Sequence, residues 1–76
     1  MSLAEQLSGA KIIRRDDVRD LTLIWYGGHG LHAFDREGHE VAFWNIGDFA
    51  QGAASEAEVM ADMDEKAATG EYPWTD

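Results

Sequence analysis

The sequence has no cysteine, one proline and few basic residues. Without thiols, disulfide bonds and cysteine-ligated metal sites are excluded, which is typical of proteins in the reducing cytoplasm. Long apolar runs are also missing: the longest, 21–26, is interrupted by Thr22 and is far too short to cross a bilayer. The N-terminal residues lack the basic start and apolar stretch of a signal peptide. The sequence therefore predicts a cytoplasmic protein.

Positive charge is scarce: six lysines and arginines face fifteen acids, giving a formal net charge of −9. Residues 48–76 hold eight acids and one base, Lys66, which sums to −7, and residues 1–47 contribute the other −2. Such charge opposes direct binding to nucleic acid or anionic membranes, because both are polyanions. It favours contact with a basic protein surface, although charge that only keeps a protein soluble would look the same.

The centre of the chain has the pattern of a β-meander. Residues 21–26 are rich in β-branched and aromatic side chains, and the glycine pair 27–28 suits a two-residue hairpin turn before a second strand at 29–34. Residues 35–38 begin with aspartate and end with glycine, typical of a type I turn closed by a G1 bulge. A third strand is predicted at 40–46.

The N-terminal part carries weaker signals. Residues 2–5 have the serine and glutamate of a capping box, which predicts a short helix near 3–8. Residues 10–15 fit either a short strand or an extended link. A fourth strand would come from this segment.

A second capping box at 55–58 predicts a C-terminal helix that ends at Thr69, with Gly70 as its C′ residue. Its apolar stripe at helical spacing is Val59, Met60, Met63 and Ala67. A chain of 76 residues is long enough for one domain only. The sequence thus predicts one α+β domain over 1–76: a three- or four-stranded antiparallel β-meander packed against a C-terminal α-helix, with a short N-terminal helix.

The turn types predict a register in which Trp25 faces Gly30 and Gly30 faces Trp44. One sheet face would then carry Leu21, Leu23, Trp25, Phe34, Trp44 and Ile46. The other would carry Ile24, Tyr26, Leu31, Ala33, Val41 and Phe43. A slip of one residue in the second turn would exchange the faces of the third strand. In this register Trp25 and Trp44 are core residues on the side of the C-terminal helix.

Both predicted faces of the sheet are apolar, and one helix covers only one of them. The other face could be covered by the N-terminal segment, by the C-terminal tail that carries Tyr72 and Trp74, or by another protein. An uncovered apolar patch of several hundred Å² usually marks an interface. A partner protein and a homodimer therefore both remain open.

No motif predicts catalysis, a cofactor or a metal site. His29 and His32 are three apart on a strand and so point to opposite faces, and His39 lies beside a turn. The glycine-rich segment 27–30 lacks the spacing of a phosphate-binding loop. Neighbouring acids such as 16–17 are expected by chance in so acidic a chain, and a small domain has little room for the apolar pocket that tunes a catalytic carboxyl. We expect a protein that is not an enzyme.

The acidic C-terminal helix is the main candidate binding site. Glu58, Asp62 and Glu65 are expected opposite its apolar stripe, where they could dock on a basic groove or mimic DNA phosphates. The predicted partner-binding residues are Glu58, Asp62, Asp64, Glu65, Tyr26 and Phe43.

In size and charge, but in no motif, the chain resembles the small acidic inhibitors made by phages and other mobile elements, including anti-CRISPR, anti-restriction and immunity proteins. The resemblance implies a binding protein that inhibits or modulates a basic, nucleic-acid-handling protein. The alternative is a structural or accessory homodimeric subunit that uses an apolar sheet face.

Overall fold

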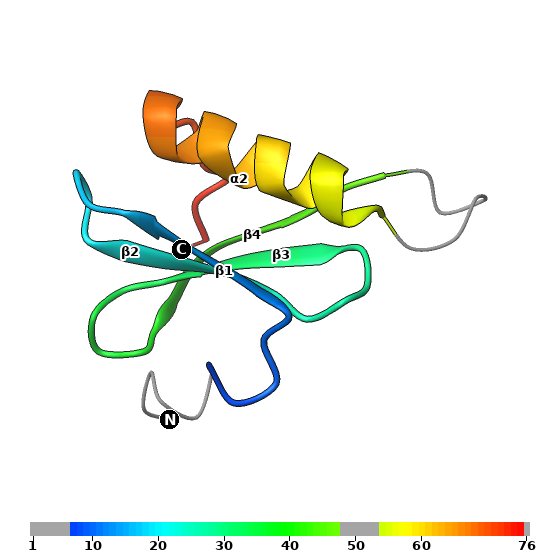
Figure 1. Cartoon of the computed structure of the whole chain (residues 1–76). Coiled ribbons are helices and arrows are strands. Elements are labelled where there is room, and N and C mark those ends of the chain that lie inside the picture. The colour runs from blue at the N-terminus through cyan, green and yellow to red at the C-terminus, as the bar shows by residue number, and fades with distance from the viewer. Residues whose placement is uncertain (1–6, 48–53, 76) are drawn as a thin grey trace.

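The computed structural model describes residues 7–47 and 54–75. It contains one antiparallel sheet of four strands in the order β1-β2-β3-β4, and a helix, α2, that lies across one face of the sheet (Figure 1). The elements are β1 Ile12–Asp16, β2 Leu21–Trp25, β3 Gly30–Phe34, β4 Glu40–Asn45 and α2 Glu56–Thr69. The predicted α+β meander is confirmed, with β1 as its fourth strand. The predicted N-terminal helix lies almost wholly outside the described residues.

The bounds of α2 follow from its two caps. The hydroxyl of Ser55 accepts a hydrogen bond from the backbone N–H of Glu58 at 3.2 Å. At the other end Gly70 adopts the left-handed conformation, with φ 73°, and its N–H donates to the Lys66 carbonyl at 2.7 Å. Both caps satisfy backbone groups that a helix end leaves unpaired. The predicted helix is confirmed from its N-cap to its last residue.

The register across the first hairpin differs from the prediction by one residue: Trp25 pairs with Leu31 instead of Gly30. The Trp25 indole N–H donates to the Gly28 carbonyl at 2.8 Å, and Ile46 donates its backbone N–H to the His29 carbonyl at 2.9 Å. Because His29 is bound to Ile46, which follows β4, the connection between β2 and β3 is longer than the predicted two-residue turn. As a result Leu31 and Ala33 face α2, whereas His32 and Phe34 face away from it.

The second turn forms as predicted, but a bulge follows it. Gly38 has φ 88° and donates its N–H to the Asp35 carbonyl at 3.1 Å, as a G1 bulge requires. Phe34 then pairs with Glu40, and Ala33 with Ala42, so Val41 is an extra residue in β4. The extra residue shifts the register of β4 by one residue relative to β3. This shift cancels the one in the first hairpin, so β4 keeps its predicted alignment with β2. Trp44 consequently lies on the same face as Trp25, as predicted. The faces predicted for β3 are wrong, and so is that of the bulge residue Val41, which packs against the core.

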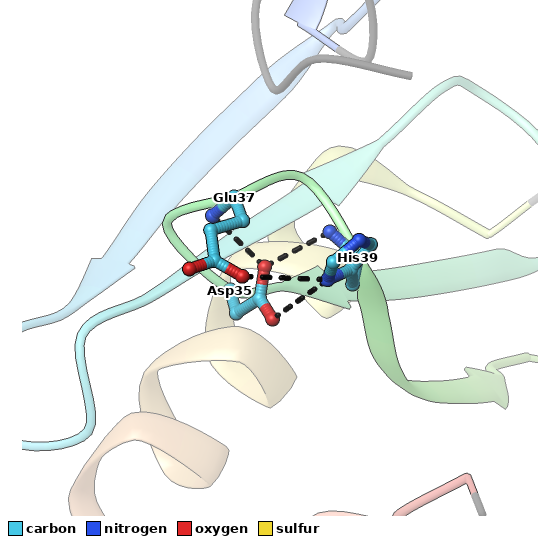
Figure 2. Close-up of side chains that lie close together, drawn as sticks. All are labelled: Asp35, Glu37 and His39. Atoms are coloured by element: carbon cyan, nitrogen blue, oxygen red, sulfur yellow. Dashed lines mark hydrogen bonds and ion pairs between the residues drawn. The ribbon is translucent and has the colours of Figure 1, made fainter.

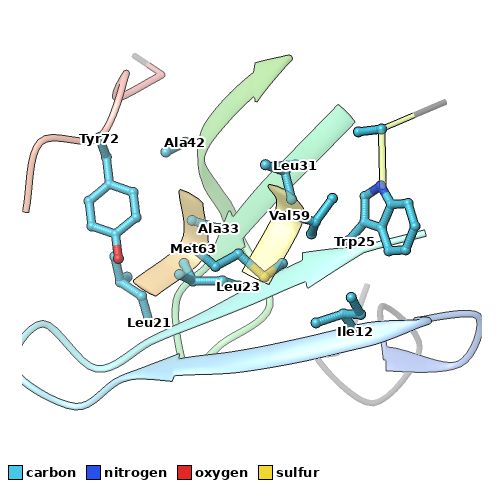
Figure 3. Packing of buried hydrophobic residues seen from close by; sticks show 11 residues of the cluster. Ile12, Leu21, Leu23, Trp25, Leu31, Ala33, Ala42, Val59, Met63 and Tyr72 are labelled. Atoms are coloured by element: carbon cyan, nitrogen blue, oxygen red, sulfur yellow. The ribbon is translucent and has the colours of Figure 1, made fainter. Parts of the chain in front are cut away.

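The core lies between α2 and the sheet (Figure 3). Its buried members are Ile12, Leu21, Leu23, Trp25, Leu31, Ala33, Ala42, Ala54, Val59, Met63 and Tyr72. Trp44 packs against this cluster but is only half-buried. On the opposite face Thr22, Ile24 and Phe34 are buried within the chain. The partly exposed apolar side chains of that face, Ile13 and Phe43, lie on the two edge strands.

The C-terminal segment docks on the sheet. Tyr72 is buried in the core, and Trp74 forms an antiparallel bridge with Ala42 of β4. The backbone N–H of Thr75 donates to the Val41 carbonyl at 2.9 Å. The segment therefore covers part of the outer edge of β4, where unpaired backbone groups would otherwise invite another strand.

We expect Trp25→Ala to lower the free energy of unfolding by about 3 to 5 kcal/mol, because the change leaves a large cavity in the core. Trp74→Ala is the matched control, since this tryptophan is 52% exposed against 4% for Trp25. Urea denaturation followed by circular dichroism measures both losses. Equal losses in the two variants would contradict the assignment of Trp25 to the core.

Candidate functional site

The acidic row predicted from the sequence, Glu58, Asp62 and Glu65, lies on the flank of α2 that faces β4. The Trp44 indole N–H donates to Asp62 Oδ2 at 2.5 Å, and Lys66 Nζ lies 3.4 Å from Asp62 Oδ1. Glu58 and Glu65 are four residues before and three after Asp62, so they share this flank. Asp62 itself does not lie opposite the apolar stripe as predicted: its side chain is 21% exposed, at the margin of the core. Glu58 and Glu65 are exposed.

The other flank of α2 lies over β1, where Arg14 of β1 neutralises the charge of Asp64. Arg14 Nη2 donates to Met60 Sδ at 2.9 Å, and Arg14 Nε lies 3.8 Å from Asp64 Oδ1. Asp64, which was predicted as a partner-binding residue, thus lies on the opposite flank from Glu58 and Glu65 and has a basic partner.

Negative charge without a basic partner gathers on α2 and directly after it. Every arginine of the chain, and Lys66, forms an ion pair with a carboxylate. Within 7–47 and 54–75, the carboxylates that have no basic or histidine partner are those of Glu56, Glu58, Glu65 and Glu71. The unneutralised carboxylates of the described residues therefore all lie on α2 or directly after it.

Three aromatic rings, those of Trp44, Tyr72 and Trp74, form an aromatic row beside the β4-facing flank of α2. The ring centroid of Tyr72 is 5.8 Å from that of Trp44 and 5.0 Å from that of Trp74. Lys66 Nζ lies 5.6 Å from the Trp44 ring centroid, within the range of a cation–π contact. The sequence predicts the tail as one possible cover of the other sheet face, whereas Tyr72 packs into the core on the α2 side. The aromatic row is not predicted from the sequence, because nothing local indicates that Tyr72 and Trp44 meet.

The buried carboxylate of Asp16 connects the aromatic row to the rest of the fold through Tyr72. Asp16 is 1% exposed, and its Oδ2 accepts hydrogen bonds from the Tyr72 hydroxyl at 2.8 Å and from Arg19 Nη1 at 2.9 Å. Its Oδ1 accepts the backbone N–H groups of Val18 and Arg19. Burial raises the pKa of Asp16, but these hydrogen bonds outweigh it and hold the pKa below its ordinary value. Burial, reinforced by the Asp16 carboxylate, raises the pKa of Tyr72. All four hydrogen bonds that Asp16 accepts hold segments of the fold together.

The remaining predicted residues, Tyr26 and Phe43, lie on the sheet face away from α2. His32 lies between them, with ring centroids 5.3 Å from Tyr26 and 5.0 Å from Phe43, and its Nδ1 is 2.5 Å from Glu40 Oε1. Burial, with Glu40 nearby, raises the pKa of the Tyr26 phenol. The structure thus brings these two aromatic residues together, but on a different surface from the acidic row.

Asp35, Glu37 and His39 form the one cluster of potential metal ligands among the described residues (Figure 2). Their contacts are those of the turn itself: Asp35 Oδ1 accepts the backbone N–H groups of Glu37 and His39, both at 2.9 Å. The His39 and Glu37 side chains are 70% and 72% exposed. Turn geometry accounts for this arrangement, and nothing in it requires an ion.

No pocket is found in the described part of the chain, and no helix there is long and apolar enough to cross a membrane. Comparisons with protein-family models, with curated proteins and with solved structures found no match. The functional argument therefore rests on the surfaces of the molecule.

We expect Asp16→Asn to lower the free energy of unfolding by about 1 to 3 kcal/mol at pH 7, because it weakens a buried charged hydrogen-bond acceptor. The pKa of Asp16 is lower in the folded state, so its contribution is present above about pH 4 and is lost as the pH falls through the folded-state pKa. The difference between wild type and variant should therefore shrink in urea denaturation at about pH 3. Asp17→Asn, at an exposed neighbour, is the control. A difference that stays constant with pH would contradict this role.

We expect dialysis against EDTA to leave the melting temperature unchanged, because backbone amides already occupy Asp35 Oδ1. Differential scanning calorimetry before and after dialysis makes the measurement. A fall in melting temperature that zinc reverses in wild type, but not in His39→Ala, would show that the cluster is a metal site after all.

Proposed function

We propose that this chain is a small acidic protein-binding module that engages a basic surface of another protein through the β4-facing flank of α2. The observation that carries the proposal is the distribution of ion pairs: the arginines and Lys66 are paired, while Glu58 and Glu65 are exposed and have no basic partner among residues 7–47 and 54–75. A surface of this kind attracts basic partners over long range and speeds their association.

A nucleic-acid-handling protein is the partner that we propose within this class. Such proteins carry basic grooves for phosphates, which exposed carboxylates can occupy. The module would then inhibit or modulate its partner by competing with nucleic acid, in the manner of the phage-type acidic inhibitors that it resembles in size and charge. A cytoplasmic location, suggested by the absence of cysteine, belongs to the same proposal.

The alternative, a homodimer formed through the sheet face away from α2, has less support. The middle of that face is buried within the chain at Thr22, Ile24 and Phe34. The partly exposed apolar residues Ile13 and Phe43 lie on opposite edge strands and so do not make one continuous patch.

The test is affinity capture from cells that encode the chain, with Glu58→Lys/Glu65→Lys compared with wild type. We expect wild type to retain a basic protein at about 0.1 M salt and to release it at about 1 M, where the Debye length falls from about 10 to 3 Å. The double variant should not retain it, because two attractions become repulsions. Asp62 stays unchanged in this variant, since it bonds to Trp44.

The matched control is Asp17→Lys/Glu37→Lys, which makes the same change in net charge at exposed turn residues outside α2. We expect this control to retain the partner at the lower salt concentration. Circular dichroism checks that all the variants fold. Equal retention by the two double variants would contradict a binding site on α2.

A further inference from the structure

The aromatic row lies at the C-terminal half of α2. Tyr72 donates its hydroxyl to Asp16, Asp16 binds Arg19, and Arg19 Nη1 contacts the Ala67 carbonyl at 3.3 Å in the last turns of the helix. Trp74 extends the row beyond Tyr72 to the outer edge of β4, and it remains 52% exposed. The row therefore ends in a tryptophan that the described fold leaves half open to solvent.

A cation already occupies the other end of the row. Lys66 Nζ lies 5.6 Å from the Trp44 ring centroid and pairs with Asp62 at 3.4 Å. An ammonium group is thus held by one aromatic ring and one carboxylate, a combination that binds cations in water. Trp74 presents a second ring of the same kind, and no lysine or arginine of the described residues lies over it.

The unpaired negative charge at this end of α2 also favours a cation. Glu65 precedes the last turn of α2, and Glu71 directly precedes Tyr72, so both belong to the same end of the helix as the row. Neither carboxylate has a basic partner within the described residues. A guanidinium suits this surface better than an ammonium, because its planar group stacks on an aromatic ring and still donates hydrogen bonds at its edge.

We propose that Trp74 seats an arginine side chain of the basic partner. The guanidinium stacks on the exposed indole, and the unpaired carboxylates of Glu65 and Glu71 at this end of α2 attract it over a longer range. This inference rests on the proposed function and deepens it, since it names the side chain that the acidic surface recognises.

The test is a titration of the full ¹⁵N-labelled chain with an acetylated hexa-arginine peptide, followed through the tryptophan indole N–H resonances. We expect the Trp74 resonance to shift most. The Trp25 resonance should not shift, because that indole is buried and bonded to Gly28. Trp74→Ala should weaken the affinity about two- to five-fold, as the loss of an exposed cation–π contact does. Hexalysine should bind more weakly and lose less on the same substitution.

Ile13→Ala is the control, because Ile13 is an apolar residue 42% exposed on the sheet face away from α2. We expect its affinity for hexa-arginine to equal that of wild type. An unshifted Trp74 indole in wild type overturns the proposal without reliance on any variant. Equal affinities of wild type and Trp74→Ala overturn it as well.

Glu58→Gln/Glu65→Gln separates this inference from the proposed function. If that variant binds hexa-arginine more weakly while Trp74→Ala does not, the arginine seat fails and the acidic surface stands. If neither variant loses affinity, both proposals fail. A loss in both variants, with the shift at Trp74, supports the seat as part of the acidic surface.

Discussion

The Asp16 carboxylate lies inside the protein where three segments meet. It accepts hydrogen bonds from the turn after β1, from the Arg19 guanidinium and from the Tyr72 hydroxyl, and Arg19 also reaches the Ala67 carbonyl of α2. Removing a buried carboxylate from water costs several kcal/mol unless such partners are present. The turn, the end of α2 and the C-terminal segment must therefore be ordered together, and a domain of this size has little stability to lose otherwise.

The position of the candidate binding surface follows from this constraint. Because Tyr72 is anchored to Asp16, its ring lies beside Trp44, and the chain continues along the outer edge of β4 to Trp74 and Thr75. The same segment that shields the edge of the sheet thus presents the most exposed tryptophan ring of the described structure. Fold and candidate site share their contacts here, whereas Glu58 and Glu65 make no contribution to the core.

Features encoded by neighbouring residues could be predicted from the sequence, and features set by distant ones could not. The caps of α2 and the turn at Asp35–Gly38 depend on residues three or four apart, and both are confirmed. The predicted register of the first hairpin is wrong because it depends on a distant contact, the bond from the Ile46 N–H to the His29 carbonyl, which joins residues 17 apart. Likewise Asp16 looked like a chance acid, since its partner Tyr72 lies 56 residues away.

The acidity of the chain can serve solubility or binding. The positions of the charges allow these two explanations to be compared. Arg15 and Arg19 neutralise acids of β1 and its turn, whereas on α2 only Asp64 and Asp62 have basic partners, Arg14 and Lys66, so the excess charge appears on α2 for structural reasons alone. Solubility accounts for that excess. It does not account for an exposed tryptophan beside the charge, because an open indole at a sheet edge favours aggregation rather than opposing it. A surface that combines Trp74 with unneutralised carboxylates is instead what recognition of a cationic side chain requires, and for this reason we favour binding.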